Sequence, residues 1–222
     1  MVCFGDSITD GTGSTPDADR RWPDRLAARM LAGPPEERFG LLNAGIGGNR
    51  LLLDAGNPGQ GVNALARLER DVLARTGVCT VVVLEGINDI QQDPSEYDPG
   101  QLIAAYRQIA LRAHDRGLRV VGGRILPFQG WHKWTPEREA VRAAVNEWIR
   151  GTDEFDGVVD FDAATRDPGQ AAAAPPGVRP VRPASAQPQI VLFEGGLDDA
   201  QCSRPHAVQP GKLCARHTRE LA

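Results

Sequence analysis

The sequence predicts an α/β protein with a doubly wound, mainly parallel five-stranded sheet and flanking helices, arranged as a three-layer sandwich. Two observations lead to this fold class. Short apolar runs alternate with segments of helical periodicity through the first 168 of 222 residues. One of these runs, Cys79 to Leu84 (CTVVVL), is rich in β-branched residues and typical of a strand that is covered on both faces, as in a parallel sheet.

The predicted elements follow one another as strand, loop and helix. Leu26 and Met30 are four residues apart, as on an amphipathic helix, and Thr135 followed by Pro136 is a helix-start signal. The predicted strands are Met1 to Phe4, a second beginning at Leu41-Leu42, Cys79 to Leu84, Arg119 to Ile125 and Gly157 to Phe161. The predicted helices are Trp22 to Met30, Val62 to Ala74, Leu102 to Arg116 and Thr135 to Ile149.

Composition and charge exclude several classes of protein. The net charge is −4 and no basic tract is interleaved with aromatic residues, so nucleic acid is not an expected partner. No run approaches the roughly 20 apolar residues of a membrane span. The opening MVCFGDS has no signal peptide as written, and the compartment stays open. The four cysteines lack CxxC spacing, so we expect free thiols and neither a metal nor a cofactor.

The chain divides into two parts of different composition. Residues 1–168 hold 25 of the 29 acidic residues, whereas residues 169–222 hold 7 of the 17 prolines and a single aromatic residue, Phe193. We therefore expect one α/β domain over 1–168 and an atypical Ala/Pro-rich extension over 169–222. The apolar run Val191 to Phe193 could pair with a neighbouring chain, so self-association through this extension is possible.

Three predicted strands end in small polar segments, which are Gly5 to Thr9, Gly45 to Asn49 and Gly86 to Asp89. In a doubly wound sheet, ligands bind outside the carboxyl ends of the strands, so these segments should share one rim. The first offers a serine, the second offers backbone N–H groups and the third offers an asparagine amide. A nucleophile with an oxyanion hole is the chemistry that such groups support.

Each segment also has an ordinary structural interpretation. A Gly-Asp-Ser triplet is more often a turn or a helix N-cap, and Asn-Asp after a strand is common turn chemistry. A dinucleotide loop is excluded, because the required third glycine is replaced by Arg50. What favours the catalytic interpretation is that all three segments occur in order, each after its own strand.

These segments resemble the first three sequence blocks of the SGNH (GDSL) serine hydrolases, a family of esterases and lipases. The matching residues are Gly5-Asp-Ser-Ile8, Asn43-x-Gly-x-x-Gly48-Asn and Gly86-x-Asn-Asp89. Later segments, including Ile125-Leu-Pro-Phe128 and Val158-Val-Asp-Phe-Asp162, look like the secreted actinobacterial-type branch. The resemblance implies a flavodoxin-like sandwich with Ser7 as nucleophile. It assigns the oxyanion hole to the Ser7 N–H, the Gly48 N–H and the Asn88 side chain.

The family's fourth block, Asp-x-x-His, is absent. None of the four histidines has an aspartate three residues before it, although a serine needs a base to become a good nucleophile. Three explanations stay open: a foreign or out-of-frame terminus has replaced the natural one, His206 supplies a substitute base, or Ser7 acts weakly without one. Asp198 and Asp199 are guesses for the acidic partner of His206.

The remaining candidates have weaker claims. Trp131, His132 and Trp134 could line a substrate pocket or pack as a loop. Arg50 could contact an anionic leaving group, although a surface salt bridge is the commoner fate of such an arginine. Asp6 and Asp10 are expected to cap the serine loop, and His114 to be solvated at a charged helix end.

The sequence thus predicts a cofactor-free serine ester hydrolase that acts on short-chain acyl or acetyl esters through an acyl-enzyme. The alternative is a catalytically impaired binding protein of the same fold, whose oxyanion donors hold a carboxylate or acetyl group without turnover.

Overall fold

The computed structural model describes residues 1–54 and 56–166. The strands are β1 (Val2–Gly5), β2 (Leu42–Gly45), β3 (Thr80–Leu84), β4 (Arg119–Gly123) and β5 (Gly157–Val159). The helices are α1 (Ser7–Asp10), α2 (Trp22–Ala32), α3 (Ala64–Leu68), α4 (Ile87–Gln91), α5 (Pro99–His114), α6 (Pro136–Gly151) and α7 (Phe161–Thr165). Shorter turns are η1 (Pro35–Glu37), η2 (Pro58–Gln60) and the π-helical η3 (Glu69–Leu73), which continues α3.

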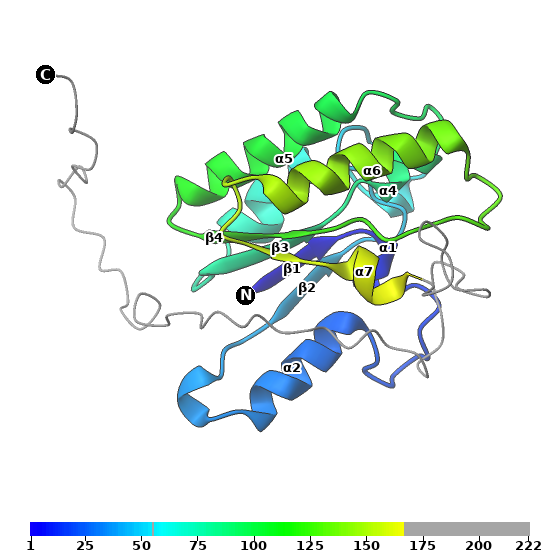
Figure 1. Ribbon diagram of the computed structural model, residues 1–222. Helices are drawn as coiled ribbons and strands as arrows, with labels where there is room; N and C mark the ends of the chain where they lie inside the picture. Colours follow the sequence, from blue (N-terminus) through cyan, green and yellow to red (C-terminus); the bar gives the residue numbers. More distant parts are fainter. Residues whose placement is uncertain (55, 167–222) are drawn as a thin grey trace, which may run out of the picture.

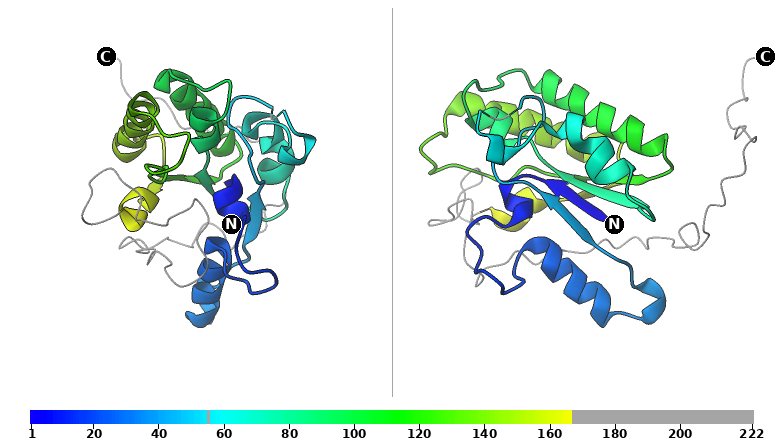
Figure 2. Two further views of the ribbon diagram at one scale, coloured as in Figure 1. Left: turned by 90° about the vertical axis from the view of Figure 1, so that its right-hand side faces the viewer. Right: turned by 180° about the vertical axis from the view of Figure 1, so that it is seen from behind.

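The five strands form one sheet in the order β2-β1-β3-β4-β5, and every pairing is parallel. Helices α5 and α6 cover one face of this sheet and α2 lies on the opposite face (Figures 1 and 2). The chain leaves β1 for β2 on one side and later returns to β3 on the other, so the order reverses at β1. Such a switch point is where doubly wound sheets open a binding crevice.

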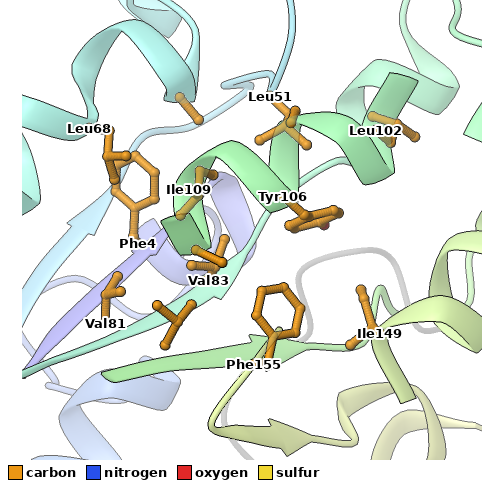
Figure 3. Close-up of a cluster of buried hydrophobic side chains, with 14 of the residues drawn as sticks. Phe4, Leu51, Leu68, Val81, Val83, Leu102, Tyr106, Ile109, Ile149 and Phe155 are labelled. Carbon is orange, nitrogen blue, oxygen red and sulfur yellow. The ribbon is translucent and has the colours of Figure 1, made fainter. Parts of the chain in front are cut away.

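The main hydrophobic core fills the space between the sheet and the layer of α3, α5 and α6. Phe4 of β1 and Val83 of β3 point into it and meet Leu68, Ile109 and other helix residues (Figure 3). Fully burying one such side chain contributes about 1.5–3 kcal/mol. Alternate positions of β1 and β3 face the opposite layer, which is why these two strands show continuous burial rather than an alternating pattern.

The predicted fold class is confirmed, and each predicted element has a counterpart whose bounds differ by a few residues. Thr135 caps α6 as expected, with its hydroxyl accepting the Arg138 N–H at 3.3 Å. The short helices α1, α4 and α7 were not predicted, because one turn of helix leaves no periodic pattern. The last strand, β5, is shorter than the predicted Gly157 to Phe161, because Phe161 begins α7.

The extension over 169–222, with His206, Asp198, Asp199 and the run Val191 to Phe193, lies outside the described residues, so the domain division remains a prediction. No helix in the described part of the chain combines the length and apolarity that a membrane crossing would need. Cys3 is a buried free thiol, as expected. That expectation is wrong for Cys79, which is disulfide-bonded.

Candidate active site

Three strands end side by side at the rim where the polar segments begin. Gly5 of β1 is in register with Gly45 of β2 on one side and with Leu84 of β3 on the other. Neighbouring strands lie about 4.8 Å apart, so the segments that leave these residues start close to one another. The predicted nucleophile and oxyanion donors all follow within four residues of these strand ends.

Ser7 is the first residue of α1, directly after the central strand. The Asp6 side chain caps this helix by accepting the Ile8 N–H at 2.8 Å, which confirms the expected capping role. A Cβ atom on Gly5 would lie 2.2 Å from Thr9 Oγ1 and 2.5 Å from the Leu84 carbonyl oxygen. Glycine is therefore required at the strand end for the chain to turn sharply into the serine helix.

Gly48 lies in the turn that follows β2. Its φ angle is +76°, in the left-handed region that favours glycine, and a Cβ atom there would lie 2.4 Å from Gln60 Nε2. The next residue, Asn49, is fully buried, and its Nδ2 donates to the Gln60 and Val62 carbonyls at 2.8 Å each. The turn is thus held on its inner side while Gly48 stays partly exposed.

Asn88 lies in α4, just after β3, and is buried. Its Nδ2 donates to the Asn49 carbonyl at 2.9 Å, and its Oδ1 accepts from Gln91 Nε2 and Gln92 Nε2 at 2.9 Å each. These contacts set the orientation of the amide, with the oxygen toward the glutamines and the NH2 group toward the glycine turn.

Three N–H groups at this rim remain unpaired within the described residues. The backbone N–H of Ser7 and that of Gly48 donate to no protein acceptor, and one of the two Nδ2 hydrogens of Asn88 is also unused. N–H donors without a protein acceptor are the groups from which an oxyanion hole is built.

The two histidines of the described region do not serve Ser7. His114 Nε2 lies 2.9 Å from Asp156 Oδ2, just before β5 begins. This pair is therefore at the amino ends of the strands, whereas Ser7 is at their carboxyl ends. The His132 ring lies against Trp131 in a tilted arrangement, with ring centroids 4.3 Å apart and an interplanar angle of 54°. In residues 1–54 and 56–166, neither ring is hydrogen-bonded to the serine.

The sequence profile of the GDSL-like lipase/acylhydrolase family matches residues 3–181. The chain belongs to that family. The match covers most of the chain and includes all three rim segments, so this GDSL-like protein is a hydrolase by family. A search of curated protein sequences finds no match.

Several solved structures of lipases and esterases share the fold of this GDSL-like protein. A GDSL-like lipase from Bacteroides thetaiotaomicron has a TM-score of 0.55 at 17% identity, covering 84% of this chain and 78% of that one. An aryl esterase from M. smegmatis has a TM-score of 0.51 at 18% identity, covering 67% and 80%. A carbohydrate acetylesterase from Sinorhizobium meliloti has a TM-score of 0.50 at 18% identity, covering 70% and 82%.

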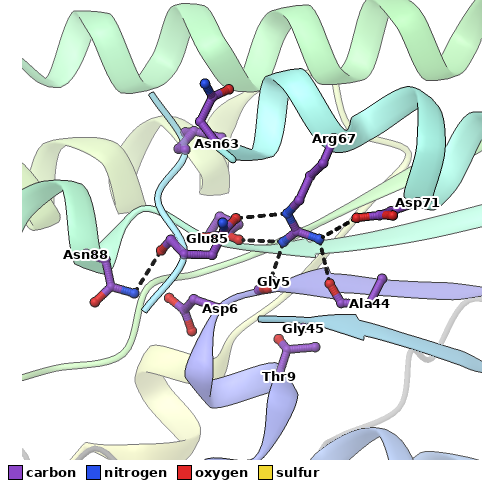
Figure 4. A network of polar contacts seen from close by, with 12 residues as sticks. Gly5, Asp6, Thr9, Ala44, Gly45, Asn63, Arg67, Asp71, Glu85 and Asn88 are labelled. Carbon is purple, nitrogen blue, oxygen red and sulfur yellow. Dashed lines mark hydrogen bonds and ion pairs between the residues drawn. The ribbon is translucent and has the colours of Figure 1, made fainter. Parts of the chain in front are cut away.

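A buried arginine ties the three strand ends of this GDSL-like domain together (Figure 4). Arg67 of α3 is 1% exposed and donates to the carbonyls of Gly5 and Ala44 at 2.9 and 2.8 Å. It also bonds Glu85 Oε1 at 3.0 Å and Asn49 Oδ1 at 2.9 Å. One guanidinium therefore contacts β1, β2, the residue after β3 and the glycine turn, in a fork geometry that lysine does not have.

Two buried carboxyl groups, those of Asp6 and Glu85, lie near this arginine. Burial raises the pKa of Asp6 from 3.8 to about 7, although the Ile8 N–H opposes the shift. Burial also raises the pKa of Glu85 well above its usual value, and the neighbouring Asp6 adds to that effect. Asp6 Oδ2 and Glu85 Oε2 have no hydrogen-bond partner in the described part of the protein, so neither carboxylate is fully stabilised.

Asp89 holds the segment after the glycine turn. Its carboxylate accepts the N–H groups of Leu51 and Leu52 at 2.7 and 2.9 Å, and burial raises its pKa. Arg50 is 3% exposed, with NH2 donating to the Pro94 carbonyl at 2.6 Å and Nε 3.9 Å from Asp89 Oδ1. The expected surface salt bridge is therefore wrong, because Arg50 is buried in the support of the rim.

The other candidate residues from the sequence take part in packing or in local hydrogen bonds. Trp131 and Trp134 are partly buried and pack against the hydrophobic core, which fits the packed-loop interpretation. Asp10 accepts the Thr12 hydroxyl at 3.3 Å. Within residues 1–54 and 56–166, no three His, Cys, Asp or Glu side chains gather as a metal site.

Sequence reasoning did not single out Arg67, Glu85 or the pair Gln91-Gln92. A signal existed for the arginine, which lies between Ala64 and Leu68 on the apolar stripe of its helix, where a charge needs a buried partner. A signal existed for the glutamines too, because they lie three and four residues after Asn88 and so share its helix face.

Proposed function

We propose that this protein hydrolyses carboxylic esters with short acyl or acetyl groups through an acyl-enzyme on Ser7. The observation that carries the proposal is a set of three N–H donors, from Ser7, Gly48 and Asn88, that have no acceptor within residues 1–54 and 56–166. A substrate carbonyl oxygen among these donors would gain hydrogen bonds as it acquires negative charge. Removing a single such donor typically lowers kcat by about 10²–10³.

In the proposed reaction, Ser7 Oγ attacks the carbonyl carbon of the ester and its proton passes to a base. The tetrahedral oxyanion is stabilised by the three donors and collapses, releasing the alcohol, which takes the proton from the base. Water then attacks the acyl-serine with the help of the same base, and the carboxylic acid leaves as Ser7 regains its proton.

For the base we propose His206, with Asp198 or Asp199 as the acidic partner. All three lie outside the described residues, and the assignment rests on their place in the sequence. This assignment is compatible with the path of the chain. The last described helix, α7, follows the carboxyl end of β5, so it lies at the same end of the parallel strands as Ser7. Helix α7 is held there by a contact between Phe161 and Trp22, the first residue of α2, whose ring centroids are 5.2 Å apart.

The hydrolysis of p-nitrophenyl acetate tests the proposal. Ser7→Ala should abolish enzyme-dependent nitrophenol release, since no nucleophile remains, and a serine-directed organophosphate should inhibit the unmodified protein. Ser14→Ala provides a matched control that should keep the wild-type rate. Release that resists both the substitution and the organophosphate would refute an acyl-enzyme on Ser7.

A histidine pair tests the base. His206→Ala should lower kcat by about 10³-fold or more if this histidine accepts the serine proton. His114→Ala should have little effect, because that ring pairs with Asp156 at the amino ends of the strands. Full activity in His206→Ala combined with none in Ser7→Ala would reject His206 as the base.

The alternative function, a binding protein without turnover, is favoured by the lack of a histidine partner for Ser7 within the described residues. It predicts acetate binding that Asn88→Ala weakens, together with no nitrophenol release by the wild type. Calorimetry with acetate and the ester assay on the same preparation separate the two functions.

A further inference from the structure

We propose that Gln92 is a positioning residue that couples the two donor-bearing loops of the oxyanion hole; the inference rests on the proposed function. Gln92 Nε2 donates to the Asn88 Oδ1 at 2.9 Å and to the Gly48 carbonyl at 3.3 Å. One amide group therefore bridges the glycine turn after β2 and the helix after β3.

The orientation of Asn88 decides whether it stabilises or repels an oxyanion. An asparagine amide presents two donors on one side and two acceptor lone pairs on the other, and a rotation of its plane exchanges them. In the rotated state, Oδ1 would face the Asn49 carbonyl and Nδ2 would face the Nε2 groups of Gln91 and Gln92. Three favourable contacts would become repulsive, so the glutamines hold the NH2 side toward the site.

Gln92 differs from Gln91 in what else it touches. Gln91 Nε2 contacts only the asparagine oxygen among the residues at this rim, whereas both hydrogens of Gln92 Nε2 have acceptors, one on each loop. With no hydrogen left for a substrate, Gln92 does not act on the oxyanion directly. Its contact with the Gly48 carbonyl holds the peptide between Gly48 and Asn49. That peptide adjoins the one that supplies the Gly48 N–H.

Gln92 is itself held in place from the helix layer. Its backbone N–H donates to the Asn88 carbonyl at 3.0 Å, which ends α4. Its carbonyl accepts the Ser95 hydroxyl at 3.1 Å, and Ser95 Oγ in turn accepts from Arg138 NH2 of α6 at 2.6 Å. Arg138 is 8% exposed, so a buried charge anchors the segment that carries the glutamine.

The first test compares Gln92→Ala with Gln101→Ala, a matched substitution at an exposed position of α5. For p-nitrophenyl acetate, Gln92→Ala should lower kcat about 10- to 100-fold with little change in KM, because a donor displaced by less than an ångström loses mainly transition-state stabilisation. Gln101→Ala should keep both constants. An unchanged kcat in Gln92→Ala, with Asn88→Ala impaired, would overturn the role of Gln92 and leave the proposed function standing.

A double-mutant cycle distinguishes positioning from a general structural effect. In the Asn88→Ala background the amide to be oriented is gone, so Gln92→Ala should cost only a small part of its single-variant effect on kcat. An equal fold-loss in both backgrounds would contradict positioning through Asn88. Gln92→Glu adds a pH readout: its activity relative to Gln92→Ala should rise from pH 8 to pH 5, as the carboxyl group gains the proton with which it can donate.

A readout without turnover separates this inference from the proposed function. In the full chain, NMR hydrogen exchange of the Asn88 side-chain NH2 should be slow in the wild type and faster in Gln92→Ala, with Gln101→Ala as control. Unchanged exchange would overturn the inference even if the wild type hydrolyses esters. Faster exchange in a protein that hydrolyses no ester would support the inference while the proposed function fails.

Discussion

Asp6 lies between the central strand and Ser7, and its two carboxyl oxygens have different surroundings. Oδ1 caps α1 through the Ile8 N–H, whereas Oδ2 is buried without a partner in the described part of the protein. A carboxylate there loses hydration, and the hydrogen bond from the Ile8 N–H compensates for only part of that loss. Its negative charge is therefore disfavoured, which explains the raised pKa.

The titration of Asp6 predicts a pH-dependent stability. Because its pKa rises from 3.8 to about 7 on folding, the folded protein keeps a proton that the unfolded chain has already lost over this range. The free energy of unfolding should therefore fall as pH rises from 5 to 7, by on the order of 2 kcal/mol from this group.

Asp6→Asn keeps a capping oxygen but cannot titrate, so the free energy of unfolding should fall less between pH 5 and pH 7 than in the wild type. The raised pKa of Glu85 leaves part of the pH dependence in place. Urea unfolding at pH 5 and pH 7 measures the difference. Asp153→Asn, at an exposed position, is the control and should keep the wild-type slope. A slope in Asp6→Asn equal to that of the wild type would mean that Asp6 is ionised throughout.

At the scale of elements, α3 does more than cover the sheet, because Arg67 reaches from it to the strand ends. Its guanidinium contacts two backbone carbonyls, two carboxylates and an asparagine oxygen. It also lies over the Phe4 ring, with Cζ 4.1 Å from the centroid. The position of the three rim segments relative to one another depends on these contacts.

Arg67→Met should therefore destabilise the fold by about 3–5 kcal/mol, since it leaves the buried Glu85 without its donor and removes the side-chain hydrogen bonds to the Gly5 and Ala44 carbonyls. Adding Glu85→Gln should recover part of this loss, because the uncompensated charge is then removed. Chemical denaturation of the two single variants and the double variant gives the coupling. The control is Arg70→Met in the adjoining π-turn, whose exposed side chain pairs with Asp71, and little change is expected. Additive losses in the cycle would contradict the pairing of Arg67 with Glu85.

At the scale of the whole molecule, stability should reside in the core between the sheet and the layer of α3, α5 and α6. Ile109 and Leu111 lie on the same helix, α5, yet one is fully buried and the other is 63% exposed. Ile109→Ala should cost about 2–5 kcal/mol through lost burial and the cavity that remains. Leu111→Ala should stay within about 0.5 kcal/mol. Thermal or urea unfolding compares the pair, and equal losses would show that this layer is not the main core.

The sequence alone determined the order of the elements and the three segments at the rim. These features are local: β-branched runs, helical periodicity and turn residues act over a few positions, so they can be recognised without knowledge of distant contacts. The serine, the glycine turn and the asparagine could be singled out as candidates because each directly follows its own strand. The one-turn helices at Ser7 and Asn88 escaped prediction, since a single turn has no period.

Only the tertiary structure decided which residues support those segments. Arg67 is 62 residues from Gly5, and Gln92 is 44 residues from Gly48, so nothing in the local sequence links them. Their pairing depends on the strand order β2-β1-β3, which brings the three loops to one edge. That the three N–H donors have no acceptor in the described part of the chain is likewise a property of the assembled rim. A hydrogen bond depends on distance and angle in space, and those are fixed only when the sheet has formed and the helices have packed against it.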